Sequence, residues 1–161
     1  MKESNMIKIE VLHCTGHGIL PKLIGLFTAS SITHSAIRIY ENEEPFIYEM
    51  QKNGCTRKMQ KSWEKVYGYH YKKTEHYISK FKYSKLKTFE GVLPYDEGTL
   101  IGSQSLYQLF GVWIGKKEKS IKDGVICSEL VAYLLDVPEW WKQSPKSLYK
   151  WCSINNINNN V

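Results

Sequence analysis

The sequence lacks an apolar run long enough to cross a bilayer, since the best stretch, residues 19–27, already contains Pro21 and Lys22. Its first five residues also lack the apolar core of a secretory signal peptide. Disorder is excluded by composition, because 42% of the 161 residues are hydrophobic and 13% are aromatic. We therefore expect one globular domain, cytoplasmic as synthesised, with later release left open.

Cysteine is scarce, and no two cysteines have the CxxC spacing of zinc or redox motifs. The four are Cys14, Cys55, Cys127 and Cys152. Without an export signal we expect reduced thiols and no disulfides. His13, Cys14 and His17 offer three zinc ligands, with Cys55 or Cys152 as a fourth. Structural zinc sites usually combine two closely spaced pairs, and the second pair is missing here. We expect no metal and no organic cofactor.

Positive charge is concentrated in one segment. Residues 51–90 hold eleven Lys and Arg against three Asp and Glu, a net charge of +8. The other residues hold eleven against thirteen, a net charge of −2. Aromatic residues are interleaved with these lysines, a pattern typical of solvated helix faces over an aromatic core or of contact with an anionic surface. No Walker loop, zinc-finger spacing or RNA-binding signature is present, so no specific nucleic acid is expected.

Hydrophobic periodicity predicts an α+β fold. Alternating residues predict strands at residues 7–11 and 67–73, and a β-branched apolar run predicts one at 32–40. Further strands are expected at 46–50 and 55–59. Helical spacing predicts helices from Pro21, from Ser62, over 74–89, over 99–113, from Cys127 until Pro138 stops it, and from Ser147. We expect one domain over residues 1–161, with an antiparallel sheet packed against helices. A frayed polar tail is expected from about residue 154.

Cys127 has the setting of a nucleophile, because it follows an apolar stub and opens a strongly periodic helix. The unpaired N–H groups and the dipole at a helix N-terminus stabilise a thiolate. The same N–H groups can hold an oxyanion. A thiolate still needs a base within hydrogen-bonding reach, and that base needs an orienting partner.

His34 and Glu49 are the candidates for these two roles, since they lie on two consecutive predicted strands. If residues 41–42 form a two-residue hairpin loop, Tyr40 pairs with Glu43 and His34 lies directly opposite Glu49. The carboxylate then fixes the imidazole tautomer and favours its protonated form. A longer loop shifts the register and spoils this pairing, and the alternative is an ordinary surface pair.

Three residues are weaker candidates for substrate binding, namely Tyr95, Asp96 and Ser128. Tyr95 and Asp96 follow Gly91 and Pro94, and they either line a cleft or form a capping loop, with Asp96 as the N-cap of the next helix. Ser128 lies directly after the proposed nucleophile.

The order of these motifs resembles one family. Its islands are Gly16-x-Gly18-Ile19-Leu20, Thr33-His34-Ser35-Ala36-Ile37, Glu49, Tyr95-Asp96 and Cys127-Ser128-Glu129-Leu130-Val131. Together they resemble the YiiX/YebB-like branch of the NlpC-type papain-like cysteine hydrolases, over roughly residues 10–150. That branch is circularly permuted, with the histidine early in the chain and the cysteine late.

The resemblance implies a permuted papain-like fold and three catalytic positions, with Cys127 as nucleophile, His34 as general base and acid, and Glu49 as the orienting residue. It implies cleavage of amide bonds in peptide or peptidoglycan-like substrates; relatives transfer acyl groups. Two departures from the family pattern are the residues His13-Cys14-Thr15-Gly16 where the family has Gly-Asp, and the lysine-rich segment 51–90.

Three functions follow as hypotheses. The first is a cysteine hydrolase acting on an amide bond. The second is an acyltransferase, thioesterase or lipid-acting enzyme that uses the same three residues, with segment 51–90 on an anionic lipid surface. The third is a binding module without turnover that holds a polyanion through the same segment.

Overall fold

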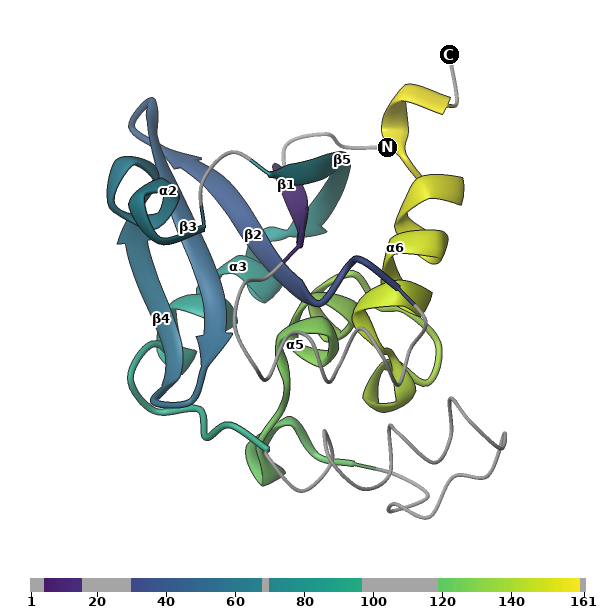
Figure 1. Ribbon diagram of the computed structural model, residues 1–161. Coiled ribbons are helices and arrows are strands. Elements are labelled where there is room, and N and C mark those ends of the chain that lie inside the picture. Colours follow the sequence, from purple (N-terminus) through teal and green to yellow (C-terminus); the bar gives the residue numbers. More distant parts are fainter. Residues whose placement is uncertain (1–4, 16–29, 68–69, 97–118, 160–161) are drawn as a thin grey trace.

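The computed structural model of the chain describes residues 5–15, 30–67, 70–96 and 119–159 (Figure 1). Two predicted helices, the one from Pro21 and the one over 99–113, lie outside the described residues. No helix within the described ranges is both long and apolar enough to cross a membrane.

Five antiparallel strands form one sheet in the order β4-β3-β2-β1-β5. The strands are β1 (Met6–Cys14), β2 (His34–Glu41), β3 (Glu44–Gln51), β4 (Gly54–Met59) and β5 (Tyr71–Ser79). The helices of the described residues are α2 (Gln60–Tyr67), α3 (Lys80–Phe89), α5 (Cys127–Leu134) and α6 (Pro145–Ile154). The α+β class predicted from the sequence is confirmed.

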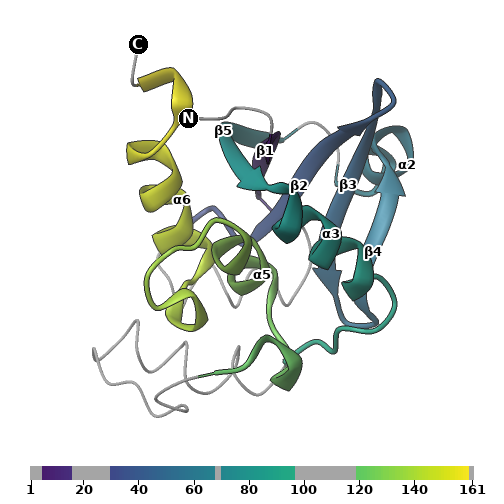
Figure 2. The same cartoon turned by 180° about the vertical axis from the view of Figure 1, so that it is seen from behind.

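The helices divide between the two faces of the sheet. Figure 1 shows α2 over one face, and the view from behind in Figure 2 shows α3 and α5 over the other. Trp63 of α2 packs in a small buried cluster with Leu12, Cys14, Ala36 and Ile47. The larger core lies on the opposite face, where α5 packs against β2 and β3 and α6 against β1. Helix α5 thus packs against β2 and β3, the two strands that hold His34 and Glu49.

The β2–β3 hairpin has a different register from the predicted one. Glu41 pairs with Glu44, and the turn consists of Asn42 and Glu43, both with positive φ. This is the backbone of a two-residue turn that matches the twist of a hairpin. Glu49 therefore pairs with Ala36 and not with His34. The shift moves the pairing by two positions, so His34 and Glu49 remain on one face as diagonal neighbours.

The boundary between β5 and α3 also differs from the prediction. Residues 74–79, expected to open a helix, continue β5, with Thr74, His76 and Ile78 buried in alternation. The helix begins at Lys80, after Ser79 caps it by accepting a hydrogen bond from the Lys82 N–H at 3.2 Å. In β5 every second residue is buried, as in a strand with one face towards a core. The lysines and aromatic residues of this segment also fit a helical spacing, which is why the sequence predicted a helix here.

The C-terminal helices depart from the expected bounds as well. Helix α5 ends at Leu134, before Pro138, and Asp136 after it has positive φ. Helix α6 begins at Pro145 with Ser144 as its N-cap, two residues before the predicted start. The expected frayed tail includes a short 3-10 helix, η5 (Ile157–Asn159), and the Asn156 side chain accepts a hydrogen bond from the Glu75 N–H.

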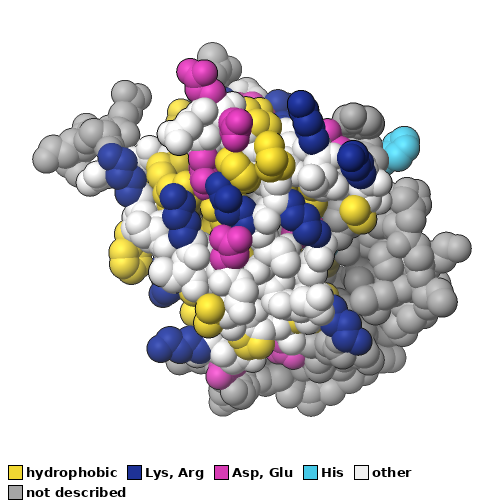
Figure 3. Space-filling view, turned by 90° about the vertical axis from the view of Figure 1, so that its left-hand side faces the viewer, with side chains coloured by type: hydrophobic (Ala, Val, Ile, Leu, Met, Phe, Trp, Pro, Cys, Tyr) yellow, Lys and Arg dark blue, Asp and Glu magenta, His cyan; other side chains and the backbone are white. Residues whose placement is uncertain are grey.

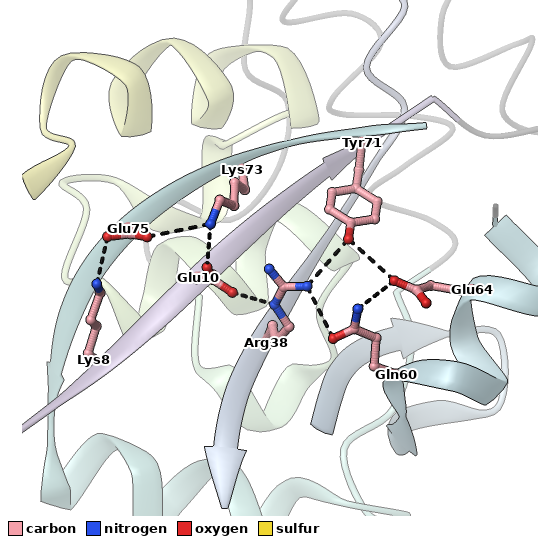
Figure 4. Close-up of polar contacts among 8 residues, drawn as sticks. All are labelled: Lys8, Glu10, Arg38, Gln60, Glu64, Tyr71, Lys73 and Glu75. Carbon is pink, nitrogen blue, oxygen red and sulfur yellow. Dashed lines mark hydrogen bonds and ion pairs between the residues drawn. The ribbon is translucent and has the colours of Figure 1, made fainter. Parts of the chain in front are cut away.

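A polar network crosses the face of the sheet beside α2 (Figure 4). At its centre the Glu10 carboxylate accepts from Arg38 and, at 2.8 Å, from Lys73. Arg38 also donates to the Gln60 side chain at 3.1 Å. The network as a whole joins Lys8, Glu75, Lys73, Glu10, Arg38, Tyr71, Gln60 and Glu64. These contacts pair the buried charges and attach the first turn of α2 to β2.

Candidate functional site

His34 and Glu49 form a direct hydrogen bond on one face of the sheet. The His34 Nε2 lies 2.8 Å from the Glu49 Oε2. His34 is the first residue of β2, and its side chain keeps 13% of its surface exposed, whereas that of Glu49 is fully buried. The predicted contact is therefore present, although it runs diagonally between the strands and not straight across.

Glu49 accepts hydrogen bonds on both carboxylate oxygens. Oε2 also receives the Trp63 indole N–H at 3.0 Å, and Oε1 receives the Gln51 amide at 2.5 Å. The Lys58 Nζ lies 3.3 Å from Oε1. Burial raises the pKa of Glu49, but His34, Trp63 and Lys58 outweigh it and hold this pKa below its ordinary value. Glu49 is therefore a buried, ionised carboxylate.

Cys127 is the first residue of α5, and its side chain lies within hydrogen-bonding reach of His34. Burial lowers the pKa of His34, but the negative charge of Cys127, the hydrogen bond to it and Glu49 together raise this pKa to about 10. The three predicted residues therefore form one connected chain, in which His34 lies between the Glu49 carboxylate and the Cys127 side chain.

A buried ion cluster supports the start of α5. The Glu129 Oε2 accepts from the Ile126 N–H at 3.0 Å and from the Lys119 Nζ at 2.8 Å. Lys119 also lies 2.8 Å from the Asp96 Oδ2. Burial raises the pKa of Glu129 to about 7, although Lys119 opposes this shift. The cluster therefore joins the start of α5 to Lys119 and to Asp96, which lie in two other parts of the chain.

The three weaker candidates lie close to α5 in the sequence or in space. Tyr95 forms an isolated bridge with Val125, and Asp96 takes part in the ion cluster with Lys119. The helix that Asp96 was expected to cap lies outside the described residues. Ser128 is fully buried, and its hydroxyl donates to the Gln143 carbonyl at 2.6 Å. These contacts tie α5 to its neighbours, while the use of these residues in substrate binding remains a prediction.

The other cysteines differ from Cys127 in their surroundings. All four are buried and unpaired, and Cys127 keeps 4% of its surface exposed. Burial raises the pKa of Cys55 and of Cys152 to about 12. Burial, Glu49 and Cys127 together raise the pKa of Cys14 above its ordinary value. These three thiols are held in the unreactive protonated form.

The residues of the zinc hypothesis have other partners or are undescribed. The His13 Nε2 lies 3.1 Å from the Thr74 hydroxyl, and the Cys14 thiol donates to the Leu12 carbonyl. His17 lies outside the described residues. Across the described ranges, no group of three or more His, Cys, Asp or Glu side chains is arranged to hold a metal ion.

Sequence reasoning missed the residues around Glu49. Trp63, Gln51 and Lys58 lie within fourteen positions of Glu49, yet no spacing rule connects them to it. The useful signal was the single tryptophan of segment 51–90, since a buried indole N–H usually requires an acceptor. The Glu129–Lys119 contact was equally hidden, because it joins a helix to a charged loop.

Comparison with known proteins finds no matching protein-family model and no matching curated protein. Among solved structures, the chain is similar to the crystal structure of "metalloprotein yiiX" from Escherichia coli O157:H7. The TM-score is 0.47 and the sequence identity 15%, and the match covers 87% of this chain and 89% of that chain.

Proposed function

We propose that the protein is a cysteine hydrolase of permuted papain-like architecture, which cleaves an amide bond in a peptide or peptidoglycan-like substrate. The observation that carries the proposal is the position of His34, with Nε2 bonded to Glu49 and the ring in contact with Cys127. This is the arrangement of a nucleophile, a base and an orienting acid.

The proposed reaction has two stages. The Cys127 thiolate attacks the substrate carbonyl and forms a C–S bond, while N–H groups at the start of α5 stabilise the oxyanion. The C–N bond then breaks as the His34 imidazolium gives its proton to the leaving amine. Next, water attacks the thioester and His34 takes its proton. The C–S bond breaks, which releases the acid and restores the imidazolium–thiolate pair.

Glu49 contributes by holding the His34 ring in one orientation and by stabilising its positive charge. It is suited to this role because it is fully buried and its pKa is lowered by its neighbours.

The direct test is incubation with peptide, muropeptide and acyl-ester donors, followed by intact-mass measurement. An amide hydrolase gives an acyl adduct on Cys127 and a free amine from the peptide or muropeptide donors, and both disappear in Cys127→Ala. The matched control is Cys152→Ala, a buried thiol on α6 that lies outside the site. Absence of an adduct and of product with every donor contradicts the proposal.

The composition of one surface favours the lipid-acting alternative. Figure 3 shows Lys and Arg side chains among hydrophobic ones on the side of the molecule where α2 and β4 lie. Met59 of β4 is 49% exposed and Val66 of α2 is 66% exposed. Basic residues beside exposed apolar ones suit an anionic membrane surface. An adduct from acyl-ester lipids alone, together with salt-sensitive binding to anionic vesicles, selects this function over peptide hydrolysis.

A further inference from the structure

Three residues of the basic segment 51–90 point towards the candidate site. Gln51 ends β3, Lys58 lies on β4 and Trp63 lies on α2, and all three donate to the Glu49 carboxylate. The segment carries a net charge of +8, and the proposed reaction assigns no role to it.

The donors around Glu49 are distributed evenly, two on each oxygen. Oε2 receives His34 and Trp63, and Oε1 receives Gln51 and Lys58. An indole N–H can only donate, so Trp63 requires an acceptor at this position. With two donors on each oxygen, a proton on the carboxyl group would displace one of them. The surroundings of Glu49 therefore select its ionised form.

Trp63 is held firmly in this position. Its side chain is fully buried against Leu12, Ala36 and Ile47. Helix α2 is attached to the sheet a second time by Gln60, whose side chain accepts from Arg38 of β2 (Figure 4). The indole N–H therefore has a fixed direction, and that direction is towards the oxygen that bonds His34.

The charged and titratable groups near Glu49 come from each neighbouring strand and from α2. His34 of β2 and Lys58 of β4 lower its pKa. Glu49 in turn contributes to the raised pKa of Cys14 on β1 and of Cys55 on β4, after burial. Only His34 and Lys58 among these groups carry positive charge, and Trp63 adds a neutral donor.

We propose that Trp63 and Lys58 are positioning residues that keep Glu49 ionised and directed at His34, so that α2 and β4 control the imidazolium–thiolate pair of His34 and Cys127. The inference rests on the proposed function for its meaning in catalysis, but it concerns a protonation equilibrium that is measurable without substrate. It gives part of the basic segment a role inside the site, apart from any surface that it offers to a partner.

The test is the pH dependence of iodoacetamide alkylation at Cys127, followed by peptide mass. Trp63→Phe keeps an aromatic ring in the cluster and removes the N–H. Loss of one donor to a buried carboxylate should move the acid limb of the alkylation curve up by about one pH unit, or about tenfold in rate on that limb. An unchanged curve in a folded Trp63→Phe protein overturns the role of Trp63.

Lys58 provides a second position for the test. Its side chain is 31% exposed, so its replacement leaves the packing of the core intact. Lys58→Met should shift the limb in the same direction by a smaller amount, and Lys58→Arg should restore it. The matched control is Lys61→Met, which removes an exposed lysine from α2. Equal curves for Lys58→Met, Lys61→Met and the unmodified protein overturn the role of Lys58.

The same data separate this inference from the proposed function. If Cys127 of the unmodified protein titrates like a free thiol, the proposed function fails. If its curve is perturbed but the two variants leave it in place, only the positioning roles fail.

Discussion

His34 lies between Glu49 and Cys127, and its protonation state depends on both. Burial alone favours the neutral ring, yet Cys127 and Glu49 raise its pKa to about 10. The imidazolium is therefore the form of His34 that these neighbours favour near neutral pH.

Replacing Glu49 with Gln should lower the pKa of His34, because the ring loses a carboxylate at 2.8 Å from Nε2. We expect a fall of about 1 to 2 units, measured by NMR titration of the imidazole. Glu44→Gln, at the exposed start of β3, is the matched control and should leave this pKa in place. Equal pKa values of His34 in both variants would show that Glu49 does not stabilise the imidazolium.

The proximity of His34 and Glu49 was predictable from the sequence, but the register of their strands was not. Histidine and glutamate on consecutive strands, and cysteine at a helix start, are patterns with a physical reason. The turn residues were misplaced by one, since Glu43 adopts a positive φ that Glu rarely takes. His34 and Glu49 still meet, because a shift of two positions in the pairing keeps both side chains on the same face.

At the scale of elements, α5 depends on a buried ammonium group. The Lys119 side chain is 6% exposed and bridges Glu129 of α5 and Asp96. This bridge joins the loop before α5 to the helix that carries Cys127.

Lys119→Met should lower the free energy of unfolding by about 3 kcal/mol or more, because removal of one partner leaves a buried carboxylate uncompensated. The measurement is denaturant unfolding near neutral pH. Lys122→Met, an exposed lysine of the neighbouring 3-10 helix, should change stability by less than about 0.5 kcal/mol. Equal losses in the two variants would contradict the role of the bridge.

Two histidines under α6 make the stability of the fold dependent on pH. His13 and His76 both lie within 3.1 Å of the Thr74 hydroxyl, and Tyr149 and Trp151 of α6 pack against their rings. Burial, followed by the charge of His76, lowers the pKa of His13 to about 3, and burial lowers that of His76. The neutral forms are therefore the ones that the folded chain accepts.

The free energy of unfolding should fall as the pH drops below about 6.5, where the unfolded histidines bind protons that the folded ones exclude. His13→Gln removes one titrating group, so its stability should change less steeply down to about pH 4. His70→Gln, an exposed histidine, should keep the steep profile. A His13→Gln protein with the same slope as the unmodified chain would contradict this account.

Helix and strand prediction succeeded where one period dominated. The alternation in residues 7–11 lies within β1, the mostly apolar run 46–50 lies within β3, and the apolar spacing after Cys127 lies within α5. The prediction failed at residues 74–79, because their sequence fits the helical and the strand period equally well. In the structure these residues continue β5, which buries Thr74, His76 and Ile78. The pairing of β5 with β1 determines the strand conformation of that segment, and this long-range pairing cannot be read from the local sequence.

At the scale of the whole molecule, one core joins the sheet to α3, α5 and α6, and a smaller cluster joins it to α2. The cysteines are distributed over this interior, with Cys14 and Cys55 on strands and Cys152 on α6. Only Cys127 combines a helix start with a histidine partner. The folded molecule should therefore give four chemically similar thiols very different reactivities.

The most direct test is the alkylation rate of each cysteine of the native protein near neutral pH, with and without His34→Ala. We predict that iodoacetamide modifies Cys127 first, that Cys14, Cys55 and Cys152 react only after unfolding, and that His34→Ala slows Cys127 by about tenfold or more. Equal rates at all four cysteines, or a Cys127 rate unaffected by His34→Ala, would contradict the assignment of this site.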